Sequence, residues 1–132
     1  LLKVLPTVDI IISILPSTQE THHLLKAEHF KAMKDSAIFM NFGRGDLVET
    51  NILKEALLQK EIAFAICDVF EEEPLPQNHP FWNMDNITVS PHVSSHSSRY
   101  LERSFEIFKP NLRKWLNGDK QLENIIDPYK GY

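Results

Sequence analysis

The chain alternates short, almost wholly apolar runs with longer segments in which apolar residues recur every three or four positions. Runs of the first kind predict buried strands, since a strand covered on both faces carries apolar side chains at successive positions. They lie at 8–15, 37–42, 62–69 and 86–90. Segments of the second kind predict amphipathic helices at 24–33, 52–59 and 97–116. Strands that alternate with helices favour βαβ units, so we expect an α/β fold with a mainly parallel sheet.

Local signals refine these elements. Thr50 is predicted as the N-cap of the helix at 52–59, and Pro110 is expected to kink or break the helix at 97–116. The acidic, proline-containing stretch 71–80 predicts a loop. Gly43 and Gly45 flank Arg44 and permit close approach to a backbone, so we expect this loop to face a ligand.

Composition narrows the class of protein. The 132 residues suffice for one domain, and a hydrophobic content of 42% can fill a core. The net charge is −4 with scattered Lys and Arg, which argues against nucleic acid or an anionic membrane as a partner. No apolar run reaches the roughly 18 residues of a membrane span. The single cysteine cannot form an intramolecular disulfide, which favours a cytoplasmic protein, and the start without Met predicts a piece of a longer chain.

A cation, a carboxylate and an imidazole follow three of the predicted strands. Arg44 follows the second strand, Glu73 the third and His92 the fourth. Because the carboxyl ends of parallel strands meet at one edge of a sheet, these side chains are expected to converge. Arginine can bind a carboxylate through two hydrogen bonds, and an imidazole supported by a carboxylate can transfer a proton. The pattern predicts an active site.

The motifs around these residues resemble the D-isomer-specific 2-hydroxyacid dehydrogenases, which include 3-phosphoglycerate dehydrogenase and glyoxylate/hydroxypyruvate reductases. The resemblance covers essentially the whole chain and rests on three ordered motifs, at 33–49, 68–76 and 90–93. It implies that residues 1–117 are the C-terminal half of a Rossmann-type NAD(P)-binding domain, with parallel strands and flanking helices. Residues 118–132 would be a tail that returns to an absent substrate domain. The family's G-x-G-x-x-G turn has no counterpart among the four glycines of this chain.

The resemblance implies a hydride transfer that interconverts a 2-oxo acid and a D-2-hydroxy acid, with NAD or NADP as cofactor. Arg44 would bind the substrate's carboxylate and carbonyl oxygen, His92 would protonate that oxygen, and Glu73 would pair with His92. The resemblance also implies a homodimer for the complete protein. Finally, it implies a set of residues that border the nicotinamide or the adenosine of the cofactor: Leu15, Pro16, Thr21, Phe42, Gly43, Arg44, Asp68, His92, Ser94 and Ser95.

Other interpretations stay open at this point. The family also includes corepressors whose assembly is governed by a dinucleotide, so a binding or regulatory protein is a second interpretation. An inactive fragment is a third. We expect no turnover from the isolated chain, because half of the sheet and the phosphate-binding turn are absent. His22, His23 and His29 lack a completing set of metal ligands, so we expect a solvated helix start and no metal site. His96 is expected to be a bystander near the long helix.

Overall fold

The computed structural model describes residues 1–130. These residues form two compact units, Leu1–Ser94 and a second that begins at Ser95. The first unit holds a sheet with two helices, and the second holds one long helix. The predicted domain boundary between residues 117 and 118 concerns the complete protein and stays a prediction.

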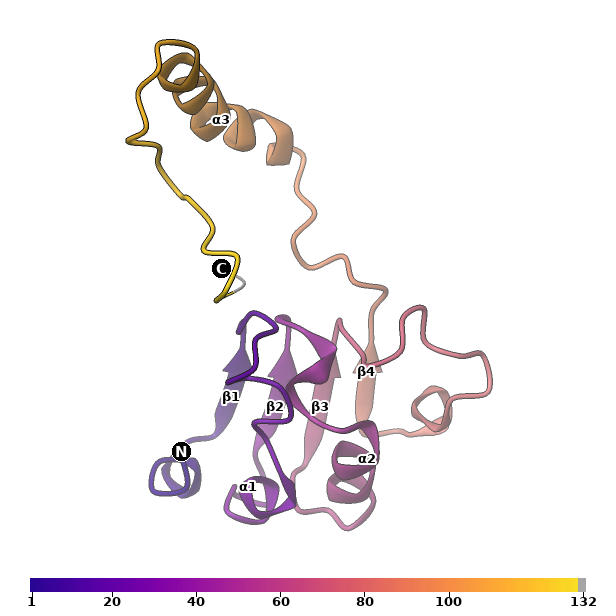
Figure 1. Ribbon diagram of the computed structural model, residues 1–132. Helices are drawn as coiled ribbons and strands as arrows, with labels where there is room; N and C mark the ends of the chain where they lie inside the picture. Colours follow the sequence, from indigo (N-terminus) through magenta and orange to yellow (C-terminus); the bar gives the residue numbers. More distant parts are fainter. Residues whose placement is uncertain (131–132) are drawn as a thin grey trace. The chain divides into compact units, whose positions relative to one another are not determined.

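Four short strands make one sheet in the first unit (Figure 1). They are β1 (Ile10–Ser13), β2 (Ile38–Asn41), β3 (Phe64–Cys67) and β4 (Ile87–Val89). Every neighbouring pair is parallel, and the strands lie side by side in chain order. The α/β fold with a parallel sheet is therefore confirmed, and all four strands end at the same edge.

Two helices connect the first three strands and build the core. Helix α1 (Ala27–Lys31) joins β1 to β2, α2 (Thr50–Leu58) joins β2 to β3, and the two helices contact each other. Phe30 of α1 meets Phe39 of β2 edge to face, with ring centroids 5.5 Å apart and both side chains fully buried. This core packs against one face of the sheet and so fixes the positions of the strand ends.

Three short 3-10 helices complete the first unit: η1 (Leu5–Thr7), η2 (Gly45–Leu47) and η3 (Pro80–Asn83). The loop between β3 and β4 contains η3, which buries Phe81 in the core. The predicted loop at 71–80 agrees with this structure, since no strand or α-helix occurs there.

The structure corrects three local predictions. Strand β1 is not buried: it lies at an edge of the sheet, and Ile10 and Ile12 are 53% and 58% exposed because they face away from the helix-covered side. The N-cap of α2 is Glu49, and Thr50 is the first helical residue. Helix α3 (Tyr100–Leu116) is not broken at Pro110, since one proline removes a single backbone hydrogen bond and the rest of the 17-residue helix supplies its own; the alternative, a kink, stays a prediction.

Within the second unit, α3 carries charged and apolar residues on different faces, and none of its residues is buried. Across residues 1–130, no helix combines the length and the apolar character that crossing a membrane requires.

Candidate active site

The candidate residues of the first unit lie at or beyond the carboxyl ends of the four strands. Leu15, Pro16 and Thr21 follow β1, and Phe42 to Arg44 follow β2. The loops after β3 and β4 supply the remaining members: Asp68, Glu73, His92 and Ser94. Ser95 begins the second unit, so its contact with a cofactor stays a prediction.

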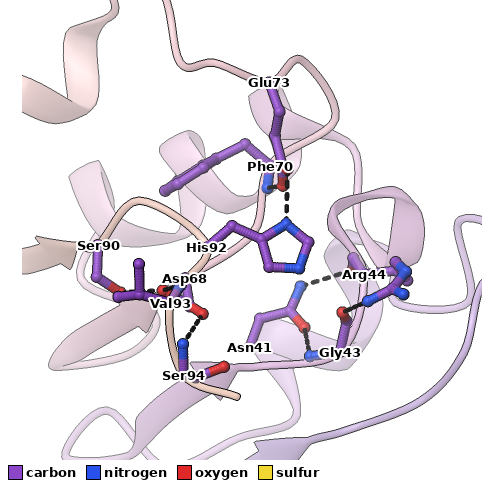
Figure 2. A network of polar contacts seen from close by, with 10 residues as sticks. All are labelled: Asn41, Gly43, Arg44, Asp68, Phe70, Glu73, Ser90, His92, Val93 and Ser94. Atoms are coloured by element: carbon purple, nitrogen blue, oxygen red, sulfur yellow. Dashed lines mark hydrogen bonds and ion pairs between the residues drawn. The ribbon is translucent and has the colours of Figure 1, made fainter. Parts of the chain in front are cut away.

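His92 and Glu73 form a direct pair. The Nδ1 atom of His92 lies 2.8 Å from Oε2 of Glu73, and the other carboxylate oxygen accepts the Phe70 N–H at 2.8 Å (Figure 2). Partial burial raises the pKa of Glu73, but the bonds from His92 and Phe70 and the charges of His92 and Arg44 outweigh it and hold the pKa below its usual value. A carboxylate at Nδ1 leaves Nε2 of the imidazole to face a substrate.

Asp68 holds the turn that carries His92. Its side chain is fully buried, and its carboxylate accepts the Val93 N–H at 2.9 Å, the Ser94 N–H at 2.7 Å and the Ser90 hydroxyl. Burial raises the pKa of Asp68, but these hydrogen bonds lower it more, so the carboxylate stays charged. His92 has a φ of +54°, in the left-handed region that few side chains adopt, and Asp68 stabilises this turn. The predicted contact of Asp68 with the nicotinamide carboxamide stays a prediction.

Asn41 shapes the loop of Arg44. Its buried side-chain amide donates to the Arg44 carbonyl at 2.9 Å, and its side-chain carbonyl accepts the Gly43 N–H at 3.2 Å (Figure 2). The Arg44 guanidinium donates to the Gly43 carbonyl at 2.9 Å. A guanidinium has five N–H donors, so this bond leaves donors that can bind an anionic ligand. No role is predicted for Asn41 from the sequence. Its position could have indicated one, because it is a polar residue at the end of an otherwise apolar strand.

The two glycines beside Arg44 allow loops of this protein to touch each other. A Cβ on Gly43 would lie 2.5 Å from the Leu15 carbonyl oxygen, and one on Gly45 would lie 1.9 Å from the Phe70 carbonyl carbon. The predicted close approach is present, but the partner is the protein's own backbone. The loop after β2 is therefore held between the loops after β1 and β3.

The loop after β1 has its own hydrogen bonds. The Thr21 hydroxyl donates to the Pro16 carbonyl at 2.6 Å and accepts the Thr18 N–H at 2.9 Å. Leu15 is 40% exposed. These residues form an ordered rim beside Gly43, where the resemblance would put the adenosine.

A second histidine–glutamate pair lies nearby, and sequence reasoning missed it. The Nε2 atom of His23 lies 3.0 Å from Oε1 of Glu71, and its Nδ1 lies 3.6 Å from Oε1 of Glu49. His23 was expected to be solvated; instead it has two acidic neighbours, because the fold brings a residue 48 positions away beside it. In the part of the chain that the structure describes, no three metal-binding side chains gather into a site.

A cavity of about 390 Å³ borders the His92–Glu73 pair. Its other walls are mainly apolar and include Phe70, Pro74, Leu75, Trp82 and Pro91. A cavity of this size beside titratable groups is typical of a small-molecule site.

Residues 1–94 match the family model described as "D-isomer specific 2-hydroxyacid dehydrogenase, NAD binding domain". The chain belongs to the D-isomer specific 2-hydroxyacid dehydrogenases. The resemblance noted in the sequence motifs is thereby confirmed.

Curated members of the family support the same assignment. The chain is 44% identical over 122 residues to glyoxylate/hydroxypyruvate reductase B of Cronobacter sakazakii, and the match covers 91% of this chain. It is 48% identical over 123 residues to the enzyme of that name from Shigella flexneri serotype 5b, with 92% of this chain covered. The chain spans 37% of the length of each of these two relatives.

Solved structures of the family agree with the fold. A D-isomer specific 2-hydroxyacid dehydrogenase from Xanthobacter autotrophicus Py2, in complex with NADPH and MES, superposes with a TM-score of 0.87 at 36% identity, covering 98% of this chain and 54% of that one. An NADPH-dependent glyoxylate/hydroxypyruvate reductase from Sinorhizobium meliloti, in complex with NADP and sulfate, gives a TM-score of 0.88 at 29% identity, covering 99% and 42%. The Rossmann-type NAD(P)-binding fold is confirmed.

Proposed function

We propose that the complete protein interconverts a 2-oxo acid and a D-2-hydroxy acid, with NAD or NADP as the redox cofactor. The observation that carries this proposal is the 2.8 Å pair of His92 and Glu73 beside the Arg44 loop. The relatives' names make glyoxylate and hydroxypyruvate the first substrates to test. A cytoplasmic homodimer is part of the same proposal.

Arg44 and His92 have different roles toward the substrate. Arg44 binds the carboxylate of the 2-oxo acid through a forked pair of hydrogen bonds and orients its carbonyl group. The cofactor, when bound, supplies the hydride that adds to the carbonyl carbon. Negative charge develops on the carbonyl oxygen, and protonated His92 stabilises it and transfers its Nε2 proton to that oxygen. In the reverse direction, neutral His92 accepts the hydroxyl proton.

Glu73 acts on His92. A carboxylate at Nδ1 sets the orientation of the imidazole and stabilises its protonated form. The low pKa of Glu73 keeps the carboxylate charged throughout the neutral range. Glu73 therefore supports His92 without exchanging a proton itself.

The chain provides part of a binding surface for the dinucleotide. The loops after β1 and β2 meet at Gly43, at the strand edge where open α/β sheets bind nucleotides. Phe42, Gly43, Asp68, Ser94 and Ser95 would border the nicotinamide, and Leu15, Pro16 and Thr21 the adenosine. We assign no pyrophosphate contact to this chain, because its four glycines form no phosphate-binding turn.

The test is an assay of the full-length protein encoded by the gene. We expect oxidation of NADH or NADPH in the presence of glyoxylate or hydroxypyruvate. Arg44→Gln should lower kcat/KM by roughly 100-fold or more, because the forked contact to the substrate is lost. Arg99→Gln removes an exposed arginine that pairs with Glu102 and should leave the rate unchanged. Equal rates for the two variants would contradict the proposed role of Arg44, and absence of 2-oxo acid reduction would contradict the function.

A further inference from the structure

His23 connects the loop after β1 to two other loops of the candidate site. Its backbone N–H donates to the Asp46 carbonyl at 2.7 Å, and its ring contacts Glu71 at 3.0 Å. Two residues later, the Leu25 N–H donates to the Leu47 carbonyl at 3.1 Å. The loops after β1, β2 and β3 are thus joined around one imidazole.

Glu71 completes this connection from the other side. One of its carboxylate oxygens contacts His23, and the other accepts the N–H of Thr50, the first residue of α2. Burial raises the pKa of Glu71, but the bonds from Thr50 and the contact with His23 outweigh it and lower the pKa. A charged carboxylate there also interacts favourably with the N-terminal dipole of α2. With both oxygens engaged, the side chain of Glu71 is held against α2 and the loop after β1.

The ring of His23 is suited to joining two carboxylates. Its two nitrogens face different residues, Glu71 at 3.0 Å and Glu49 at 3.6 Å. A protonated imidazole donates from both nitrogens, whereas a neutral one donates from only one. The residue also has a φ of +49°, in the left-handed region that few residues other than glycine adopt.

We propose that His23 and Glu71 form a clamp that positions the catalytic pair. The clamp fixes Glu71, and Glu73, the partner of His92, follows two residues later in the same loop. It also fixes the segment just after Thr21, on the rim assigned to the cofactor. His23 is a positioning residue in this view, since it acts through Glu71 and Glu73. This inference rests on the proposed reductase function.

The test uses four variants of the full-length protein. His23→Asn removes the imidazole but tolerates positive φ, and Glu71→Gln keeps an acceptor for Thr50 but removes the charge that binds His23. His29→Asn and Glu72→Gln are the matched controls, because each alters a residue of the same type that has no hydrogen bond or ion pair with His23 or Glu71. We expect both clamp variants to lower kcat roughly tenfold while KM for the 2-oxo acid changes little, since a small displacement of the catalytic pair affects chemistry more than binding. The controls should retain the parent kcat.

The double variant His23→Asn/Glu71→Gln decides whether the two residues act together. A clamp predicts that the double variant is no worse than either single variant in kcat and in resistance to chemical denaturation. Additive losses in both measurements would overturn the clamp. Coupled losses of stability with an unchanged kcat would overturn the positioning role.

The proposed function can fail separately from the clamp. A parent protein that reduces no 2-oxo acid overturns the proposed function, and the positioning role fails with it. Denaturation of the single and double variants does not depend on activity, so it still shows whether the His23–Glu71 pair exists as a unit.

Discussion

Two histidine–glutamate pairs lie around the loop after β3, and they differ in what surrounds the imidazole. Glu73 pairs with His92 and Glu71 pairs with His23, while Glu72 separates them in sequence. Both histidines have positive φ, +54° and +49°. His92 has one carboxylate partner, and its other ring nitrogen lies on the side of Asn41 and Arg44 (Figure 2). His23 faces a carboxylate at each nitrogen.

This difference agrees with the proposed roles, proton transfer for the His92 pair and loop positioning for the His23 pair. An imidazole that must exchange a proton needs one nitrogen held and the other accessible to substrate. His92 meets this condition, and 43% of its side-chain surface is exposed. An imidazole with both nitrogens directed at carboxylates is suited to holding loops together, which describes His23.

The largest effect is expected from removing the imidazole of His92, the proposed general acid. His92→Asn keeps a side chain that tolerates positive φ but cannot act as a general acid at neutral pH. In the full-length protein it should lower kcat/KM roughly 100- to 10,000-fold, against a roughly tenfold effect of His23→Asn. Steady-state kinetics with glyoxylate measures both. Similar losses in the two variants would remove the distinction between the two pairs.

A smaller effect is expected from the buried carboxylate that holds the His92 turn. Asp68→Asn replaces one acceptor oxygen by an N–H donor, which leaves a donor of Ser90, Val93 or Ser94 without a partner. A buried group that loses its hydrogen bond costs about 1–3 kcal/mol, so chemical denaturation should show a loss of this size. Asp85→Asn, an exposed change, is the control and should stay within about 0.5 kcal/mol of the parent. A parent-like Asp68→Asn would show that the turn does not need the charge.

The stability of the fold should depend on pH through three carboxylates: Glu71 and Glu73 of the two pairs, and Asp68. The pKa values of Asp68, Glu71 and Glu73 lie below the ordinary values of 3.8 for Asp and 4.5 for Glu. A carboxylate with a lowered pKa stabilises the fold above its unfolded-state pKa, and that contribution is lost as pH falls through the lowered value. Denaturation at pH 7 down to pH 3 should therefore show falling stability below about pH 4.5.

Substitutions resolve the source of this acid sensitivity. Asp68→Asn should flatten the dependence most, because Asp68 is fully buried, and Glu71→Gln and Glu73→Gln should flatten it less, because their carboxylates are partly screened by water. Equal slopes in the parent and all three variants would assign the acid sensitivity to other groups.

Much of the architecture was predictable from local pattern. The four apolar runs became four parallel strands, and the rule that such strands end at one edge placed Arg44, Glu73 and His92 in the loops at that edge. The errors occurred where neighbours in space decide. The run at 8–15 is predicted to be buried, but Ile10 and Ile12 face the side of the sheet that α1 and α2 do not cover, so they stay exposed. Likewise, local pattern does not show that Gly43 and Gly45 accommodate the backbone of Leu15 and Phe70, whereas the prediction that their loop faces a ligand stays a prediction.

Motifs and apolar patterning were enough to predict the family, the alternation of strands and helices, and the three residue types expected to carry the chemistry. Two contacts emerged only in the folded chain: Glu71 lies beside His23, and Asp68 holds the turn of His92. The physical reason is distance along the chain: the His23–Glu71 and Asp68–Ser94 contacts join residues 48 and 26 positions apart. Local propensity carries no information about such contacts, because they form only when the packed core brings the strand ends together.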